Sequence, residues 1–198
     1  MGPSGPIFIG DKMKYIVAGT NRPESRSLAL GSYVQSIYKA LGEDVELFSL
    51  EDVGVNELSA PAFGNAEGQG SQMRSTIEKI NHSEGLIFIV PEYNGSYPGA
   101  LKYFIDHWDY PASFEHRPIA FIGIGGRFGG LRPVEHLQGV FGYRNAYMFP
   151  DRVFISNVWD VMEGSEVKDE TIQLLLKAQA EGFQKFVTAL KSQNLIPT

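Results

Sequence analysis

The feature that most constrains this chain is a run of six uncharged residues, 85–90, followed directly by a polar loop. The run is rich in branched and aromatic side chains and is bounded by Gly85 and Pro91. Such a run is typical of a strand covered on both faces, as in a parallel sheet with helices on each side. Since open α/β sheets hold their ligands beyond the carboxyl ends of the strands, the loop at residues 91–99 is the first candidate for a binding site.

The composition excludes several kinds of site. The 198 residues contain no cysteine, which rules out catalytic thiols, iron–sulfur clusters and cysteine-ligated zinc and favours an intracellular protein. The four histidines show no metal-binding spacing. The formal net charge of -6 argues against a nucleic-acid or anionic-membrane surface. No apolar run reaches the roughly 20 residues of a membrane span, so we expect a soluble, cytoplasmic protein.

Strand and helix patterns alternate along the chain. Strands are expected at residues 12–19, 44–50, 85–90, 118–124 and, on either side of Pro150, at 146–149 and 153–155. Apolar residues at helical spacing predict helices over residues 30–41, 71–82, 100–108, 131–141 and 168–192. Residues 1–12 are expected to be an N-terminal extension. Residues 13–198 are expected to be one domain, because no repeat or shift in composition divides them.

Five strands alternating with five helices predict an α/β fold with one doubly wound, five-stranded parallel sheet and helices on both faces. We expect the flavodoxin-like strand order 2-1-3-4-5, whose switch point lies between strands 1 and 3. The loops after these strands, 20–27 and 91–99, then flank one crevice. The glycine-rich turn after strand 4, residues 125–130, borders the same crevice. The loop at 51–71 is longer than compact domains usually keep.

The loop at residues 20–27 has the groups of a phosphate site at the start of a helix. Thr20, Ser25 and Ser27 supply hydroxyls, and Arg22 and Arg26 supply positive charge. Unsatisfied N–H groups and the helix dipole favour an anion there, and arginine adds charge-assisted hydrogen bonds. The alternative is a capped helix with two solvated arginines. The loop is neither a P-loop nor a G-x-G-x-x-G turn.

The other two loops suit a flat ligand. Asn94, Gly95 and Gly99 allow tight turns and a close approach of the backbone. For Glu92 taken alone, a role as a solvated or capping carboxylate is favoured over a functional one. The turn after strand 4 has four glycines, Gly125, Gly126, Gly129 and Gly130. They suggest a backbone brought against a ring, although an ordinary flexible turn is the alternative. Arg127 within the turn is a candidate for a nucleotide phosphate.

The segment Pro91-Glu92-Tyr93-Asn94-Gly95-Ser96, followed by Gly99-Ala100-Leu101-Lys102, resembles the signature of the NADPH-dependent FMN reductase family. Residues 19–27 are similar to the family's first loop, and residues 125–130 are similar to its later glycine turn. The resemblance covers residues 13–190 in the same order. The chain departs from the family at Tyr103, where asparagine is usual, on a helix near the family's subunit contact.

The resemblance implies a noncovalently bound FMN, with NADPH or NADH as hydride donor. Around the FMN phosphate it places Thr20, Arg22, Arg26 and Ser27. Around the isoalloxazine it places Pro91, Glu92, Tyr93, Asn94, Gly95 and Ser96. On the far side of the ring it places Gly125, Gly126 and Arg127. No metal is implied.

The resemblance also implies an NAD(P)H oxidoreductase in which flavin N5 carries the chemistry and no catalytic side chain is required. A small-molecule acceptor such as a quinone, flavin, azo compound or metal ion is expected, together with a homodimer or homotetramer. The alternative is a flavodoxin-type electron carrier, which binds FMN but has protein partners and no NAD(P)H activity. Flavodoxins carry a T-x-T-G-x-T loop that is missing here. A receiver-type signalling domain would need an acidic cluster after strand 1, which Gly19-Thr20-Asn21 lacks.

Overall fold

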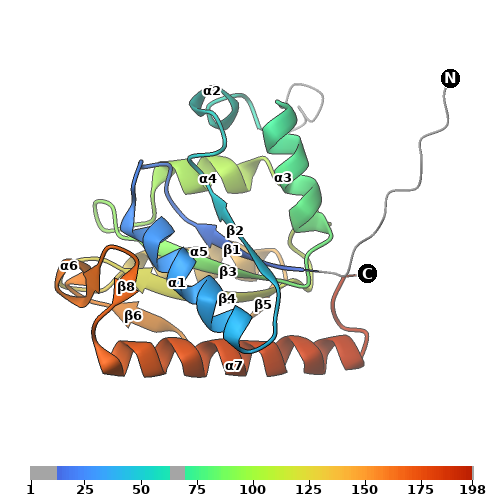
Figure 1. Cartoon of the computed structure of the whole chain (residues 1–198). Coiled ribbons are helices and arrows are strands. Elements are labelled where there is room, and N and C mark those ends of the chain that lie inside the picture. Colours follow the sequence, from blue (N-terminus) through green and yellow to red (C-terminus); the bar gives the residue numbers. More distant parts are fainter. Residues whose placement is uncertain (1–12, 63–69, 198) are drawn as a thin grey trace, which may run out of the picture.

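The computed structural model describes residues 13–62 and 70–197 (Figure 1). The extension predicted at residues 1–12 lies outside this part of the chain, as does the stretch 63–69 of the long loop. The described strands form a sheet in the order β2-β1-β3-β4-β5, and every neighbouring pair is parallel. The predicted doubly wound sheet and its strand order are therefore confirmed.

The strands lie close to their predicted positions. The first four are β1 (Lys14–Ala18), β2 (Val45–Ser49), β3 (Gly85–Pro91) and β4 (Pro118–Ile124). Two short strands share the fifth position. β5 (Tyr147–Met148) pairs with the start of β4, and β6 (Val153–Ile155) pairs with its end. Pro150 lies between them and cannot donate a hydrogen bond to the ladder, which accounts for the break.

Helices cover both faces of the sheet, as Figure 1 shows. On one face pack α1 (Arg26–Ala40) and α7 (Glu170–Ser192). On the other face pack α3 (Ser71–Asn81), α4 (Gly99–Asp106) and α5 (Leu131–Tyr143). Both layers follow the predicted apolar patterns. Each helix buries its apolar stripe against the sheet, so the sheet between the two helix layers must be apolar on both faces.

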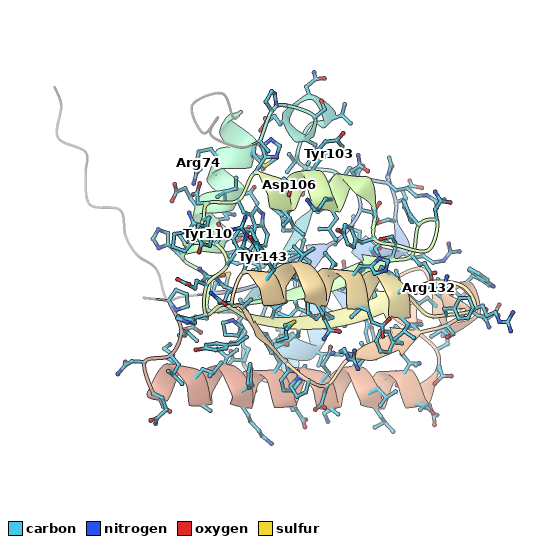
Figure 2. All side chains as sticks on the ribbon, turned by 180° about the vertical axis from the view of Figure 1, so that it is seen from behind. Arg74, Tyr103, Asp106, Tyr110, Arg132 and Tyr143 are labelled. Carbon is cyan, nitrogen blue, oxygen red and sulfur yellow. The ribbon has the colours of Figure 1, made fainter. Side chains whose placement is uncertain are left out.

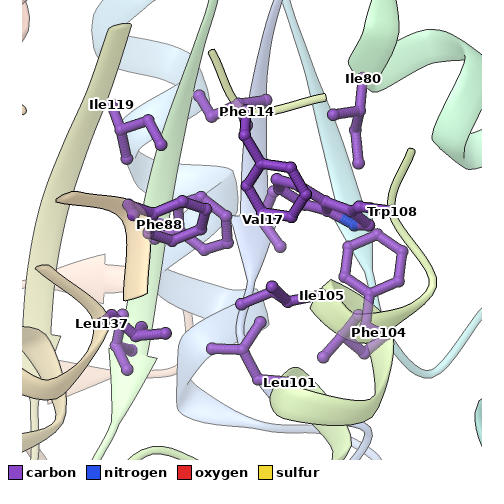
Figure 3. Close-up of a cluster of buried hydrophobic side chains, with 14 of the residues drawn as sticks. Val17, Ile80, Phe88, Leu101, Phe104, Ile105, Trp108, Phe114, Ile119 and Leu137 are labelled. Atoms are coloured by element: carbon purple, nitrogen blue, oxygen red, sulfur yellow. The ribbon is translucent and has the colours of Figure 1, made fainter. Parts of the chain in front are cut away.

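The central strand β3 shows this requirement directly. All its residues are buried, and they alternate between the two cores. Phe88 faces the core under α4 and α5 (Figure 3). Its ring centroid lies 5.1 Å from that of Phe141. Ile87 and Ile89 face the core under α1 and α7. Burying such side chains stabilises the fold by about 1.5–3 kcal/mol each, which explains why the run carries no charge.

Several short elements were not predicted. Inside the long loop lies α2 (Val55–Leu58). Between β6 and α7 lie α6 (Val158–Val161) and a hairpin of β7 (Met162–Glu163) with β8 (Glu166–Val167). Elements of two to four residues are too short to show a period in sequence. Because α6 follows the end of β6, it reaches the edge of the sheet at which the strands end. None of the described helices is long and apolar enough to cross a membrane.

Candidate functional site

The loop after β1 turns directly into α1. Ser25 is the N-cap, and its Oγ accepts a hydrogen bond from the backbone N–H of Leu28 at 3.2 Å. This cap holds the first turn of the helix in place. Arg22 and Arg26 remain exposed on either side of it, whereas Ser27 turns inward.

The Ser27 hydroxyl is the clearest sign of a ligand in this loop. The residue is only 1% exposed, and among the described residues its Oγ has no hydrogen-bond partner. A buried polar group without a partner costs about 1–3 kcal/mol, so such groups are rare unless a ligand or water satisfies them. At the start of a helix, where free N–H groups favour an anion, a phosphate would be a suitable partner.

One side-chain contact joins the loop after β3 to this first loop. Thr20 Oγ1 and the Tyr93 hydroxyl lie 3.0 Å apart, and Thr20 Oγ1 also accepts a hydrogen bond from the Arg22 N–H at 3.2 Å. Beyond Tyr93 the chain closes a tight turn through backbone hydrogen bonds in both directions between Tyr93 and Ser96. Asn94 and Gly95 at its tip have φ angles of 52° and 79°, a conformation that this pair tolerates well.

The turn after β4 lies against the same loop. The backbone N–H of Glu92 donates to Ile124 O at 3.0 Å, and that of Gly125 donates to Ile155 O at 3.1 Å. These bonds tie together the ends of β3, β4 and β6. A Cβ added at Gly126 would lie 3.2 Å from the Trp159 ring, closer than most real contacts. Glycine at this position therefore lets Trp159 approach the backbone.

These loops surround a cavity of about 180 Å³. Eight of the predicted residues line it, namely Arg22, Arg26, Ser27, Pro91, Glu92, Tyr93, Gly125 and Gly126. Thr20 is buried beside Tyr93, while Asn94, Gly95, Ser96 and Arg127 do not line the cavity. Pockets that enclose a whole drug-sized ligand usually have roughly 300–1,000 Å³. This cavity could therefore enclose only part of a flavin and would leave the rest at the surface.

Trp159 is a site residue that the sequence interpretation missed. It lies on α6, is 53% exposed and lines the cavity together with Val158. The position of these residues in the sequence could have suggested a role, because they follow the carboxyl end of the last strand of the sheet, where folds of this kind hold their ligands. The cavity is also lined by Glu24, Ser25 and Ile124.

A larger cavity, of about 720 Å³, lies between α4 and α5 and contains none of the predicted cofactor residues. His107 is part of its wall, is 3% exposed, and has its Nδ1 2.7 Å from the Tyr103 carbonyl oxygen. This burial indicates a packing role for His107. We assign the candidate site to the smaller cavity because all three predicted loops meet there.

Comparison with known proteins places the chain in a family. Residues 14–160 match the sequence model of the NADPH-dependent FMN reductases. The chain belongs to this family. It is 30% identical over 126 residues to the FMN-dependent NADPH-azoreductase of Staphylococcus aureus (strain USA300), and 27% identical over 124 residues to that of Staphylococcus saprophyticus. Each match covers 62% of this chain, and the chain spans 65% of the length of each of these relatives.

Solved structures show the same fold. The NAD(P)H:acceptor oxidoreductase FerB of Paracoccus denitrificans superposes with a TM-score of 0.71 at 21% identity, over 90% of this chain and 98% of FerB. The apo form of an NADH:FMN oxidoreductase superposes with a TM-score of 0.73 at 16% identity, over 88% of this chain and 89% of that one. At such identities the likeness demonstrates the fold alone.

Membership in this family implies FMN and NADPH as its cofactors, and the cavity fits FMN in two respects. On one wall, Arg22, Arg26 and the Ser27 hydroxyl, which no other described residue satisfies, suit a phosphate. On the other, Pro91, Tyr93 and Gly126 line the wall that a flat ring would contact. These residues come from different strands and meet only through the fold.

Proposed function

We propose that this protein is an FMN-dependent NAD(P)H oxidoreductase with a small-molecule acceptor such as a quinone, a flavin, an azo compound or a metal ion. The observation that carries the proposal is the buried Ser27 hydroxyl, which has no hydrogen-bond partner in the described part of the chain and lies in the wall of a cavity where the three loops of this family meet. The curated relatives, named as FMN-dependent NADPH-azoreductases, support the same activity.

In this proposal the first loop holds the FMN phosphate. Ser27 donates a hydrogen bond from a site that water reaches poorly, and Arg22 and Arg26 neutralise the phosphate charge from the exposed side. Thr20 acts indirectly, because its Oγ1 bonds to the Tyr93 hydroxyl and so sets the distance between the first two loops.

The loops after β3 and β4 position the ring. Pro91, Glu92 and Tyr93 border it from β3, and Gly125 and Gly126 border it from β4. FMN held by these residues would supply the redox chemistry, namely hydride transfer from NAD(P)H and electron transfer to the acceptor. Trp159 is half exposed at the edge of the cavity, where it would limit which molecules reach the ring.

A homodimer or homotetramer is part of the proposal. Three tyrosines on the face formed by α4, α5 and the segment after α4 are strongly exposed: Tyr103 at 55%, Tyr110 at 59% and Tyr143 at 79% (Figure 2). They lie around the larger cavity, two of them in its wall. Aromatic side chains are enriched at protein interfaces. Light scattering would measure the oligomeric state, and Tyr143→Glu should shift it toward monomer.

We further propose that residues 13–198 act as one FMN-binding domain in the cytoplasm.

The direct test of the function is optical. Purified protein reconstituted with FMN should be yellow, and anaerobic NADPH should bleach it. Steady NADPH oxidation with a quinone or azo dye would separate the enzyme from an electron carrier, which would bind FMN but show no such turnover. Protein that stays colourless after reconstitution, or whose flavin is not bleached by either nicotinamide nucleotide, would refute the proposal.

A further inference from the structure

Four arginines lie at the edge of the sheet where its strands end: Arg22, Arg26, Arg127 and Arg132. Within residues 13–62 and 70–197, no carboxylate forms an ion pair with any of them. The chain as a whole carries a net charge of -6, so acidic partners are available in number. None of these four guanidinium groups is therefore held in an ion pair within the described protein, although Glu24 and Glu92 also line the cavity at this edge.

The four arginines form two pairs in different places. Arg22 and Arg26 follow β1, whereas Arg127 and Arg132 follow β4. The strand β3 lies between β1 and β4 in the sheet. Because neighbouring strands are about 4.8 Å apart, the two loops leave the sheet roughly 10 Å from one another. FMN has a single phosphate, so a phosphate held by the first pair leaves the second pair without an assigned anion.

The second pair is held in place by an aromatic ring. The guanidinium carbon of Arg127 lies 5.5 Å from the centroid of Phe128, and that of Arg132 lies 5.1 Å from the same centroid. Phe128 is 48% exposed, so both guanidinium groups stack on a ring at the surface. Stacking on one ring restricts both arginines and keeps their charges close together.

Further contacts connect this pair to the loop after β3. A Cβ added at Gly95 would lie 3.7 Å from Nη1 of Arg132, so the guanidinium lies directly over that loop. Ser96 Oγ and His136 Nδ1 are 2.8 Å apart, which ties the same loop to the second turn of α5. Figure 2 shows Arg132 at the end of α5 that is remote from Tyr143. The pair therefore flanks the loop assigned to the flavin ring.

We propose that Arg127 and Arg132 form a subsite for a phosphate group of the hydride donor. This inference rests on the proposed function, because a nicotinamide that meets the flavin ring must leave its own phosphates outside the cavity and near the ring. Guanidinium groups bind phosphate through paired, charge-assisted hydrogen bonds. A local pair of positive charges would also attract a strongly anionic dinucleotide to a protein of net negative charge.

The experiment uses FMN-loaded protein and the variants Arg127→Gln, Arg132→Gln and their double variant. Arg152→Gln is the matched control, because Arg152 also stacks on a phenylalanine, Phe154, at 5.6 Å but directly precedes β6, whereas the proposed pair follows β4. Calorimetry measures binding of NADP⁺, NAD⁺ and adenosine 2′,5′-bisphosphate, and a flavin titration measures FMN affinity. The double variant should bind NADP⁺ at least about tenfold more weakly, since hydrogen bonds between charged groups are lost. Arg132→Gln alone should also weaken NADP⁺ binding, with FMN affinity unchanged.

The probes identify which phosphate is bound. Weaker binding of NADP⁺ and adenosine 2′,5′-bisphosphate, with NAD⁺ unaffected, would assign the subsite to the 2′-phosphate. Equal losses for NADP⁺ and NAD⁺ would assign it to the diphosphate. NADP⁺ binding within twofold of wild type in the double variant, or a loss no larger than that of Arg152→Gln, would overturn the inference. A variant that loses affinity for FMN but binds NADP⁺ normally would also overturn it. Wild-type protein that NADPH fails to bleach would instead refute the proposed function.

Discussion

The hydroxyl oxygens of Thr20 and Tyr93 lie 3.0 Å apart and form a side-chain bridge between the loops that follow β1 and β3. These strands are neighbours in the sheet although they are far apart in sequence. If the bridge sets the width of the cavity, removing either hydroxyl should weaken FMN binding by about 0.5–1.5 kcal/mol. Tyr93→Phe and Thr20→Val should then show less than additive effects when combined. Fully additive losses in flavin titrations would show that the two hydroxyls act independently.

Arg22→Ala should weaken FMN binding by roughly 1–3 kcal/mol, because a charge-assisted contact to phosphate is lost. Riboflavin is the matched control ligand, since it has the same ring but no phosphate. Its affinity should not change. If riboflavin and FMN weaken by the same factor, Arg22 contacts the ring or supports the loop, and the phosphate lies elsewhere.

Ser27→Ala should have opposite effects on the empty and loaded protein. Without FMN, removing a buried hydroxyl that lacks a partner among the described residues should leave the free energy of unfolding unchanged or raise it by up to about 1 kcal/mol. With FMN, the lost hydrogen bond should reduce affinity by about tenfold. Urea unfolding and flavin titration measure the two effects. A variant that is destabilised without FMN and binds it normally would contradict the assignment of Ser27 to the phosphate.

Asp109 should make stability depend on pH in the acid range. The hydrogen bond from the Arg74 guanidinium lowers the pKa of this carboxyl, and Asn81 Nδ2 also donates to it at 2.8 Å. Because the folded-state pKa is depressed, the stabilisation is present above the unfolded pKa of about 3.9 and is lost as the pH falls through the folded value. Since both partners are partly exposed, it should amount to about 1 kcal/mol or less. In urea unfolding, Asp109→Asn should be less stable than wild type at pH 7 and equal to it in strong acid. A difference that stays the same in acid would contradict this prediction.

Arg117 should contribute strongly to stability without any role at the site. Its side chain is 0% exposed, and it donates to the carbonyl oxygens of Ser83, Asn81 and Ala112. Burial lowers the pKa of the guanidinium to about 10. Arg117→Met would remove the buried charge but leave these carbonyls without donors, so we expect a loss of roughly 2–4 kcal/mol in urea unfolding. A loss below about 1 kcal/mol would show that water replaces the guanidinium.

Local patterns carried most of the fold prediction. The uncharged run at residues 85–90 predicted a strand buried on both faces, and β3 is such a strand. The predicted positions of α3, α5 and α7 differ from the observed bounds by no more than two residues. These predictions hold because burial imposes a period on each element that can be read without its neighbours. The break between β5 and β6 at Pro150 could be predicted for a similar reason, since proline lacks a backbone N–H and so interrupts the strand that contains it.

The amino-acid sequence by itself was therefore enough to predict the sheet, its main helices and the three loops, because each of these depends on residues close together in sequence. Only the tertiary structure decided which groups of those loops meet. The unpartnered Ser27 hydroxyl, the Thr20–Tyr93 bridge and the place of Trp159 depend on distances between separate strands. The same is true of Arg132, which lies over Gly95 although 37 positions separate them. Hydrogen bonds and charge pairs act over only a few ångströms, so their partners are known only once the chain has folded.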